Sequence, residues 1–485
     1  MLPASQTITP MQIKTPLAAI KAGYNFFPFQ REEIAFMVNS PSLHQYSADS
    51  MGLGKSVIAL GFANAISAHR LLVVSPAGLR LNWLGKSSIW YDLAKNSGYA
   101  ILSGEDLYKI ERKLVMDKGY MPSPLFVSYD MIAKNDRLFN YLRSRTWDLM
   151  VLDEASAIRN IEAKRTRRVL TMWADTKNVK RVLAMDGTPM KNSAKDLFPP
   201  LFMMVPGLEY MPTQDRELCA NFDDFTDFFT FVYNGQYGTV YKGARNPEHL
   251  RDMLRVRGQF FSRHLKKDVM KDLPEKNYER VDLDLTVKAD PNDFATAAAV
   301  DRFLKAVEND DDEFINGNKK CFGVLRRQLG EAKAASKEAL ELVSGVLDAG
   351  EPVILYFYHH SVRDALIKQY QKAYPDLKIV VHDGTISPLQ KQKNIDAFQR
   401  GEASILLAQV EAAVGYDAFV ASYGFYYEYA YLPGVNEQAI DRMHRYGQKN
   451  AVNGYYLVAD NAFDRELVKN FIKKHKAINK VIGDE

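Results

Sequence analysis

The chain has 485 residues, a length that suits roughly two to four domains, and its content of 47% hydrophobic and 25% charged residues is ordinary for a globular protein. No run of about 18 apolar residues is present, which excludes a helical membrane span, and the N-terminus lacks the features of a signal peptide, so we expect a cytoplasmic protein. The net charge of +4 neither indicates nor opposes a nucleic-acid partner, and the two widely spaced cysteines, Cys219 and Cys321, argue against a disulfide scaffold or a cysteine-based zinc site.

Short apolar runs alternate with helical patterns in two parts of the chain, near residues 25–200 and 345–470. Runs of this kind are typical of parallel strands buried on both faces, and their alternation with helices indicates βαβ units. We therefore predict an α/β fold with two doubly wound parallel sheets: a first lobe at 1–204, a mainly helical insertion and linker at 205–345, and a second lobe with a C-terminal helix at 346–485. The predicted strands are Leu71–Ser75, Leu125–Ser128, Leu149–Leu152, Arg181–Ala184, Val353–Tyr358, Lys378–Val381, Ser404–Ala408, Tyr423–Tyr427 and Tyr455–Val458.

The strongest local signal is a glycine-rich turn, Asp49-Ser-Met-Gly-Leu-Gly-Lys-Ser56, between a strand-like segment at 44–48 and a helical pattern at 56–68. In this context backbone N–H groups and the helix N-terminus attract a phosphate group. Lys55 would reach the β- and γ-phosphates, and Ser56 would bind Mg²⁺. The backbone of Gly52, Leu53 and Gly54 would complete the cradle, although Asp49 stands where the general pattern has its first glycine.

A pair of carboxylates ends the apolar run at 149–152. Nucleotide hydrolysis requires one carboxylate to hold Mg²⁺ and another to orient and activate the attacking water. We assign Asp153 to the metal and Glu154 to general-base chemistry. A solvated loop is the usual explanation of such a pair, but its position about a hundred residues after a phosphate turn favours the catalytic one.

The region between the lobes contains few strand-like runs. Phe222, Phe225, Phe228 and Phe229 recur at helical spacing, which favours one apolar helix face over a platform for stacking bases. Residues 309–314 form an acidic turn, and residues 332–347 form a helix pattern.

Three segments resemble motifs I, II and III of superfamily-two helicases: residues 51–56, Asp153-Glu-Ala-Ser156 and Asp186-Gly-Thr-Pro189. Asp49 at the head of the first segment resembles the Swi/Snf-type branch in particular. Further segments agree with this branch in the same order along the chain: residues 27–30, 73–83, 127–130, 263–274, 383–384, 411–417 and 438–448.

This resemblance implies two RecA-like lobes that use ATP and Mg²⁺ as cofactors. Gln30 matches the adenine-reading glutamine, and Gly415, Asp417 and Gln438 match nucleotide-side positions of the second lobe. Arg445 would be the arginine finger that stabilises the transition-state charge, with Arg442 beside it. Since Gln438, Arg442 and Arg445 are spaced four and three apart, we expect them to share one helical face.

Three residues depart from the family pattern, and the first of them, Ser156, affects the expected coupling of hydrolysis to nucleic acid. Ser156 replaces a histidine, Asp186 replaces a threonine or serine, and Tyr416-Asp417 replaces leucine-asparagine. None removes a group that ATP chemistry requires.

Translocation along nucleic acid needs contacts to phosphates, which Lys, Arg, amide and hydroxyl groups provide. The basic cluster at 164–168 is as consistent with a solvated face as with DNA contact, and residues 473–476 are a weaker candidate. The tyrosine-rich run at 423–431 favours a buried strand over base stacking. The candidate contacts are Ser75, Arg80, Asn82, Ser128, Thr188, Lys191, Asn192, His382 and Gln409.

The resemblance predicts an ATP-dependent translocase or helicase acting on duplex, forked or branched DNA in recombination, repair or replication. Two alternatives stay open: a 3′ to 5′ strand-separating helicase, and a module that uses ATP as a switch or displaces RNA polymerase. Replication, recombination or transcription proteins are the candidate protein partners.

Overall fold

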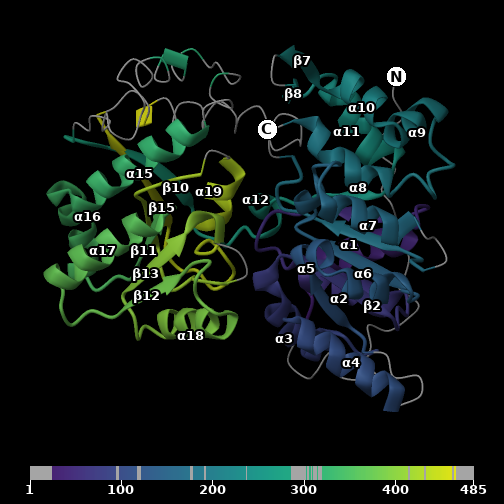
Figure 1. The fold of residues 1–485 in the computed structure, drawn as a ribbon, viewed down its shortest axis with the longest axis horizontal. Helices are drawn as coiled ribbons and strands as arrows, with labels where there is room; N and C mark the ends of the chain where they lie inside the picture. The colour runs from purple at the N-terminus through teal and green to yellow at the C-terminus, as the bar shows by residue number, and fades with distance from the viewer. Residues whose placement is uncertain are drawn as a thin grey trace. The chain divides into compact units, whose positions relative to one another are not determined.

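Two parallel sheets organise the chain (Figure 1). The computed structural model describes residues 25–93, 98–116, 122–174, 178–190, 193–235, 238–285, 319–412, 416–430, 433–460 and 464–465, with isolated positions between 302 and 314. By their contacts the described residues form two units. Unit 1 holds the residues up to Phe231 and Lys242–Val269, and unit 2 holds Val232–Tyr241 and the residues from Met270 onward. The three-part division at residues 204 and 345 stays a prediction.

Unit 1 is built on a seven-stranded sheet in which every described pair of strands is parallel. Its order is β3 (Tyr99–Ala100), β4 (Leu125–Ser128), β2 (Leu71–Ser75), β5 (Leu149–Asp153), β6 (Val182–Met185), β1 (Gln45–Ser47) and β9 (Phe261–Ser262). The four strands predicted for the first lobe are confirmed, and β1, β2, β4, β5 and β6 are buried throughout, as a sheet covered on both faces requires.

Twelve α-helices accompany this sheet in the described parts of unit 1. They are α1 (Pro28–Asn39), α2 (Lys55–Ala65), α3 (Arg80–Trp90), α4 (Gly104–Met116), α5 (Tyr129–Lys134), α6 (Asp136–Arg143), α7 (Lys164–Ala174), α8 (Phe198–Phe202), α9 (Thr213–Ala220), α10 (Phe222–Phe229), α11 (Pro247–Asp252) and α12 (Lys266–Val269). A two-stranded hairpin, β7 (Phe231–Gly235) and β8 (Gly238–Lys242), lies between α10 and α11 in sequence.

The phenylalanines of α10 form a core, as the spacing predicts. Phe225 and Phe229 are fully buried, and the Phe225 ring lies 5.4 Å from that of Phe198 in α8. Phe222 meets Phe198 edge-on, and Phe228 packs against His249 of α11. Because these rings contact one another, α10 offers no stacked platform for bases.

Unit 2 is built on a six-stranded parallel sheet. Its order is β10 (Lys276–Leu283), β15 (Val452–Ala459), β14 (Tyr423–Tyr426), β11 (Val353–Phe357), β13 (Ile405–Gln409) and β12 (Ile379–His382). The described helices of more than one turn are α15 (Lys319–Ala335), α16 (Lys337–Asp348), α17 (His360–Ala373), α18 (Pro388–Gln399) and α19 (Pro433–Ile440). All five strands predicted for the second lobe are confirmed, and β10 joins them from the expected insertion.

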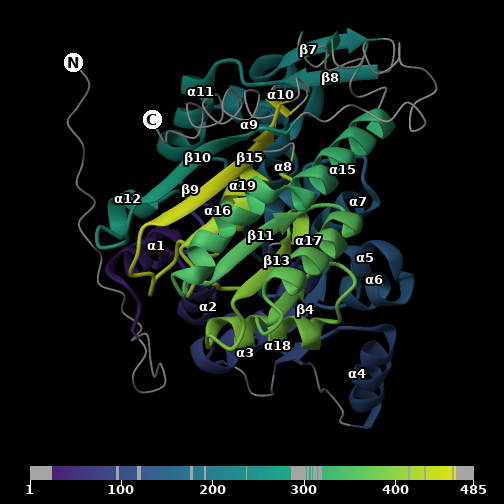
Figure 2. The ribbon, with the colours of Figure 1, turned by 90° about the vertical axis from the view of Figure 1, so that its left-hand side faces the viewer.

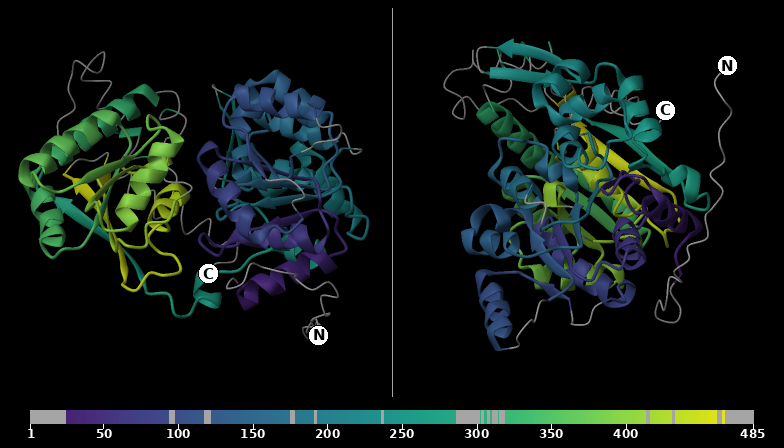
Figure 3. Two further views of the ribbon diagram at one scale, coloured as in Figure 1. Left: turned by 90° about the horizontal axis from the view of Figure 1, so that it is seen from below. Right: turned by 90° about the vertical axis from the view of Figure 1, so that its right-hand side faces the viewer.

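Helices cover both faces of this sheet, which is the doubly wound arrangement (Figure 3, left). Each face has a hydrophobic core of its own. Leu355 and its alternate neighbours along β11 pack with α16 and α17, which lie in front of the sheet in Figure 2. Ile354 and Tyr356 pack with α18 and α19 on the other face. The Tyr426 ring stacks 4.4 Å from Tyr356 and 4.7 Å from Tyr456, so the tyrosine-rich run is a strand as far as Tyr426 and then a buried loop as far as Ala430.

The expected helix at 332–347 is two helices instead of one. Ser336 interrupts it, because its backbone is extended and its hydroxyl accepts a hydrogen bond from the Ala339 N–H, which caps α16. The acidic turn at 309–314 and the basic residues 473–476 lie almost wholly outside the described residues. None of the helices that the structure describes combines the length and apolarity needed to cross a bilayer.

Alanine substitution of two helical glycines tests how closely α1 packs on α2, because only one of the two faces α1. A Cβ atom on Gly61 of α2 would lie 2.6 Å from Ile34 Cδ1 and 2.8 Å from Phe26 Cζ, whereas a Cβ atom on Gly85 of α3 would meet nothing within 4 Å. We expect Gly61→Ala to lower the melting temperature, because overpacking by about 1–3 kcal/mol exceeds the gain in helix propensity. Gly85→Ala should raise it by the propensity gain of up to about 1 kcal/mol. Equal stabilisation by both changes, measured by thermal unfolding, would show that α1 and α2 are not closely packed.

Candidate functional site

The predicted first-lobe motifs follow the strands of one sheet. The glycine-rich turn follows β1, Arg80 follows β2, Ser128 ends β4, and Asp153 and Asp186 end β5 and follow β6. Since all these strands are parallel, their carboxyl ends lie at one edge of the sheet, which is where open α/β sheets bind ligands.

The glycine-rich turn has the backbone that its sequence requires. Gly52 and Gly54 have φ angles of +84° and +81°, in a region that favours glycine. Gly54 caps α2, and its carbonyl accepts hydrogen bonds from the N–H groups of Val57 and Ile58. Lys55 Nζ donates to the Asp49 carbonyl at 2.7 Å, so its ammonium lies over the turn that would hold the phosphates.

Gln30 is tied to this turn. Its buried side chain donates from Nε2 to the Leu53 carbonyl at 2.9 Å and accepts from the Phe27 N–H at 3.0 Å. A Cβ atom on Gly54 would lie 2.6 Å from Gln30 Nε2, so the close approach also depends on that glycine. The reading of adenine by Gln30 stays a prediction, but its amide is placed by the phosphate turn itself.

Asp153 is a buried carboxylate with two N–H donors. The Trp83 indole donates to Oδ2 at 2.7 Å, and the Glu154 N–H donates to Oδ1 at 3.1 Å. Burial raises the pKa of Asp153, and the Trp83 hydrogen bond and the positive charges of Lys55 and Lys86 offset part of that shift. A cation at this carboxylate would favour its charged form further, as expected of a metal ligand.

Glu154 has a left-handed backbone, with φ of 51° and ψ of 58°. A non-glycine residue rarely adopts this region unless its surroundings impose it, and such residues cluster at functional sites. Its carbonyl accepts the Ala157 N–H at 2.9 Å, which begins the following turn. The backbone therefore turns sharply between the two carboxylates.

Lys86 and Trp83 were not assigned from the sequence. Lys86 Nζ lies 3.4 Å from Ser56 Oγ, so α3 brings a second lysine to the pair of residues expected to bind Mg²⁺. The spacing of three places both side chains on one face of α3, a signal that becomes informative only once α3 is known to face the site.

Asp186 joins the second and third motifs. Its carboxylate is fully buried and accepts the Ser156 N–H at 2.7 Å and the Thr188 N–H at 2.8 Å. Its own N–H donates to the Ser47 carbonyl at the end of β1. Two of the three departures from the family pattern therefore meet at one contact, and Asp186 ties the loop that carries Asp153 to the loop after β6 and to the end of β1.

In unit 2, Asp417 and Arg445 form an ion pair, and Arg445 Nε also donates to the Asp441 carbonyl at 3.1 Å. Arg442 is 4% exposed, and its guanidinium lies 6.0 Å from the centre of the Tyr416 ring. Gln438 is buried in α19. Gly415 lies outside the described residues.

The expectation that Gln438, Arg442 and Arg445 share one helical face is wrong, because α19 ends at Ile440. Beyond Ile440 the backbone forms turns, in which the Arg442 N–H donates to Ala439 O at 3.2 Å and the Met443 N–H donates to Ile440 O at 2.9 Å. The Tyr356 hydroxyl also bonds to Ala439 O at 2.8 Å, and the Ala418 N–H bonds to Arg442 O at 2.9 Å. Arg442 and Arg445 therefore lie in the turns that follow α19.

The start of β10 holds these turns. Lys276 Nζ lies 3.1 Å from the Asp441 carboxylate, and His444 Nε2 lies 2.7 Å from the Pro274 carbonyl. Thus the linker element recognised at 263–274 leads directly into contacts with the arginine-bearing turns of unit 2.

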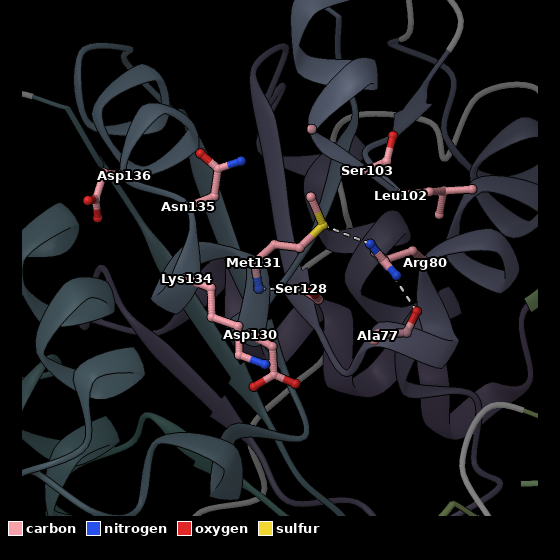
Figure 4. A pocket seen from close by; sticks show the side chains of 11 residues that line it. Ala77, Arg80, Leu102, Ser103, Ser128, Asp130, Met131, Lys134, Asn135 and Asp136 are labelled. Carbon is pink, nitrogen blue, oxygen red and sulfur yellow. Dashed lines mark hydrogen bonds between the residues drawn. The ribbon is translucent and has the colours of Figure 1, made fainter. Parts of the chain in front are cut away.

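Two candidate nucleic-acid residues, Arg80 and Ser128, line a pocket of about 560 Å³ in unit 1 (Figure 4). Arg80 is 5% exposed and donates to the carbonyls of Ala77 at 2.9 Å and Ile101 at 2.6 Å. The Ser128 hydroxyl accepts the Met131 N–H at 3.3 Å and caps α5. Both residues shape the wall of the pocket, and its more exposed side chains are Leu102, Ser103, Asp130, Lys134 and Asp136.

The basic cluster at 164–168 lies at the start of α7 beside this pocket. Arg168 pairs with Asp136, and Arg165 lies 3.7 Å from Asp130. Both acids line the pocket. In the structure these arginines therefore balance the acidic side of the pocket, which reduces its repulsion of a polyanion.

The other described candidate contacts are mostly buried or half-buried. The Ser75 hydroxyl is buried and donates to the Pro76 carbonyl, Thr188 is 9% exposed, and Asn82 is half-buried in α3. Burial lowers the pKa of His382 to about 4, so its imidazole is neutral at pH 7. Gln409 accepts the Gly384 N–H at 3.2 Å. Lys191 and Asn192 lie outside the described residues, and the nucleic-acid role of the whole set stays a prediction.

Comparison with known families matches the SNF2-related domain to residues 29–299 and the helicase conserved C-terminal domain to residues 338–447. The first match alone spans more than half of the chain. The chain belongs to the SNF2-related family. It is accordingly an ATP-hydrolysing enzyme of the helicase class, on the Swi/Snf-type branch of superfamily two.

Three known proteins illustrate the relationship. The SNF2-related chain is 27% identical, over 94% of its length, to the Xenopus tropicalis SWI/SNF-related matrix-associated actin-dependent regulator of chromatin subfamily A-like protein 1. It is 23% identical, over 90% of its length, to the Bos taurus DNA annealing helicase and endonuclease ZRANB3. It spans 45% and 38% of the length of these relatives. The Sulfolobus solfataricus SWI2/SNF2 ATPase core in complex with dsDNA aligns over 99% of both chains, with 18% identity and a TM-score of 0.41.

The residues of this SNF2-related chain fit ATP with Mg²⁺. The buried Asp153 carboxylate has a raised pKa, which a divalent cation would lower, and the Ser56 hydroxyl lies in the first turn of α2. Lys55 and Lys86 provide the positive charge that a triphosphate requires. Asp153 and Ser56 are thus the residues that would hold Mg²⁺.

Asp186→Asn should lower kcat for ATP more than it raises KM. An asparagine side chain has one acceptor oxygen, so one of the buried N–H groups of Ser156 and Thr188 would lose its partner at a cost of about 1–3 kcal/mol. The loop carrying Asp153 and Glu154 would then be displaced while the phosphate turn stays in place. Steady-state ATPase kinetics measure the effect, and the exposed Asp252→Asn is the matched control. An unchanged kcat in Asp186→Asn would contradict the positioning role of the carboxylate.

Proposed function

We propose that the chain is an ATP-dependent translocase that acts on duplex, forked or branched DNA in recombination, repair or replication. The observation that carries the proposal is the shared edge of the unit 1 sheet. Neighbouring strands β5 and β2 lead, respectively, to the buried Asp153 carboxylate and to Arg80 in the wall of the pocket. A change at the nucleotide can thus reach the pocket through paired backbone.

Each residue of the ATP half-site has a distinct task in this proposal. The Lys55 ammonium exchanges its bond to the Asp49 carbonyl for the β- and γ-phosphates. Ser56 and Asp153 would hold Mg²⁺, which would neutralise part of the phosphate charge. Glu154 orients the attacking water and accepts its proton. The Trp83 indole keeps the Asp153 carboxylate in one orientation.

The pocket of unit 1 supports a contact with the DNA backbone. Lys134 provides an exposed cation, while Ser103 and Asn135 provide polar groups at its rim. Phosphate contacts carry no sequence information, which suits a motor that must act on any sequence. A DNA-acting role also agrees with the similarity to the Bos taurus DNA annealing helicase and endonuclease ZRANB3.

The branched-DNA assignment is tested by the steady-state ATPase rate with no nucleic acid, single-stranded DNA, linear duplex, a model fork and a four-way junction. We expect strong stimulation by duplex and a further rise with the fork or junction. Glu154→Gln, which should bind ATP without turning it over, controls for contaminating ATPases. Stimulation by single strands alone would instead favour the 3′ to 5′ helicase, and no response to any DNA would favour an ATP switch or an RNA-polymerase-displacing motor.

Arg445→Ala should retain ATP and DNA binding and lose most hydrolysis, by about 10³-fold or more if Arg445 is the finger. The Asp417 carboxylate that pairs with Arg445 orients the guanidinium before ATP binds, so Asp417→Asn should cause a smaller loss. The exposed Arg400→Ala in the same unit is the control. Single-turnover hydrolysis measured alongside nucleotide binding separates the two effects, and normal hydrolysis in Arg445→Ala would show that another residue is the finger.

A further inference from the structure

Three titratable side chains meet directly beneath the phosphate turn, and the ATP site described above does not use them. They are Glu33 of α1, Asp49 at the head of the turn, and His264 just after β9. Glu33 and Asp49 are at most 1% exposed, and the His264 side chain is 26% exposed. The three ligand-type atoms lie within 4.8 Å of one another.

The hydrogen bonds of this cluster leave two carboxylate oxygens without a donor. Asp49 Oδ1 accepts the His264 N–H at 2.7 Å and contacts His264 Nδ1 at 2.9 Å, and Glu33 Oε1 accepts the Ser262 hydroxyl at 2.6 Å. Glu33 Oε2 lies 3.6 Å from His264 Nδ1, and neither this buried oxygen nor the buried Asp49 Oδ2 has a donor at hydrogen-bond distance among the described residues. Ionisation of both of these neighbouring buried carboxylates would cost a large free energy. A proton bound to one of them removes the repulsion and provides a hydrogen bond to the other.

We propose that Glu33, Asp49 and His264 form a proton-sharing cluster, called the lock, that positions the phosphate turn for ATP. Glu33 is its positioning residue: the lock is closed while Glu33 is protonated and opens when Glu33 loses its proton. The role toward ATP rests on the proposed function of Lys55 and Ser56. None of the three side chains needs to touch the nucleotide.

The lock acts on the turn through the backbone of Asp49 and Ser50. The Asp49 carbonyl accepts Lys55 Nζ at 2.7 Å, and the Ser50 N–H donates to the His264 carbonyl at 2.9 Å. On the strand before the turn, the Ala48 N–H donates to the Ser262 carbonyl at 2.8 Å. Release of the Asp49 side chain would therefore loosen the Asp49 backbone that the lysine contacts and the segment after β9 that supports it.

The charges that face the cluster come from every element packed around it. Glu33 belongs to α1, Asp49 follows β1, Lys55 begins α2, and Arg263 and His264 follow β9, with Arg263 bonded to the Ala48 carbonyl. With Glu33 protonated, one carboxylate faces the His264 imidazolium. With Glu33 ionised, a second negative charge lies beside Asp49 and close to the site of a polyphosphate.

The pKa directions agree with this arrangement. Burial, followed by the Asp49 charge, raises the pKa of Glu33 from 4.5 to about 7. The hydrogen bond to Asp49 and the nearby Glu33 carboxylate raise the pKa of His264 to about 10, so it stays charged at neutral pH. A carboxyl with a raised pKa contributes stability that is complete below about pH 4.5 and is lost as the pH rises through about 7. The lock is therefore mostly closed at pH 6 and mostly open at pH 8.

Glu33→Gln separates this lock from ordinary packing, because glutamine can still donate to Asp49 but does not titrate. The full chain is titrated with ATP from pH 6 to 8 in the Glu154→Gln background, which prevents turnover. We expect ATP affinity to fall by up to about 10-fold across this range, the change in the protonated fraction of a group with pKa about 7. In the Glu33→Gln chain that part of the pH dependence should vanish, so its affinity at pH 8 should exceed that of the parent.

Glu32→Gln, on the exposed side of the same helix, is the control and should keep the parental profile. Thermal unfolding over the same pH range gives a readout without nucleotide: the melting temperature should fall above pH 7 in the parent and less in Glu33→Gln. Identical pH profiles in parent and Glu33→Gln would overturn the lock alone. Absence of ATP binding by the parent at every pH would overturn the proposed function and the lock's role with it. Stoichiometric Zn²⁺ binding that Glu33→Gln abolishes would replace the shared proton with a metal ion.

Discussion

Parallel pairing of β2, β5 and β6 is the constraint on which the unit 1 site depends. The register Val74 to Leu152 and Asp153 to Met185 ends these strands at the same level, so their loops emerge at one edge. Two carboxylates, Asp153 and Asp186, are thereby buried where water cannot solvate them, and backbone and indole N–H groups must do so instead. Glu154 and Thr188 donate within their own loops, whereas the Trp83 indole comes from α3 and the Ser156 N–H comes from the neighbouring loop. The hydrogen bonds to the two carboxylates therefore link the loops into one network. The order of the strands in the sheet decides which loops are neighbours in the site.

The sequence was sufficient for elements whose signal is local. Buried parallel strands are continuous apolar runs, and all nine predicted ones are present, while the phosphate turn is recognisable because its glycines need positive φ angles. Residues that act through contacts distant in sequence carried no such signal. Glu33 and His264 are 231 positions apart and look like surface charges in their own segments, and their burial beside Asp49 follows only from the packing of α1 and β9 against β1. Asp186 was recognised as a departure from the family pattern, but its two N–H partners became apparent only in the fold.

Unit 2 shows why spacing alone misplaces an arginine. A repeat of four and three predicts one helical face only while the helix continues, and here the chain leaves the helix at Ile440 and forms turns. The Tyr356 hydroxyl and the Ala418 N–H bond to the carbonyls of Ala439 and Arg442 in these turns. Lys276 and His444 then fix the resulting turns against the start of β10. The arginines are thus held by tertiary contacts, so their orientation is specified by residues more than 160 positions away.

The strands β9 and β10 have a practical consequence for dividing the chain. Each is the edge strand of its sheet, yet both lie in the segment that the sequence presents as an insertion, joined by residues 263–275. A fragment that stops at residue 204 would leave the β1 backbone without the Phe260 and Ser262 carbonyls to which Tyr46 and Ala48 donate. A fragment that starts at residue 346 would leave all eight residues of β15 without their β10 partners. Removal of β9 or β10 would expose the edge of β1 or β15 to pairing with other chains, so lobes excised at those boundaries would aggregate. A cut between Val269 and Met270, where the two units divide, would leave each sheet with its own edge strand.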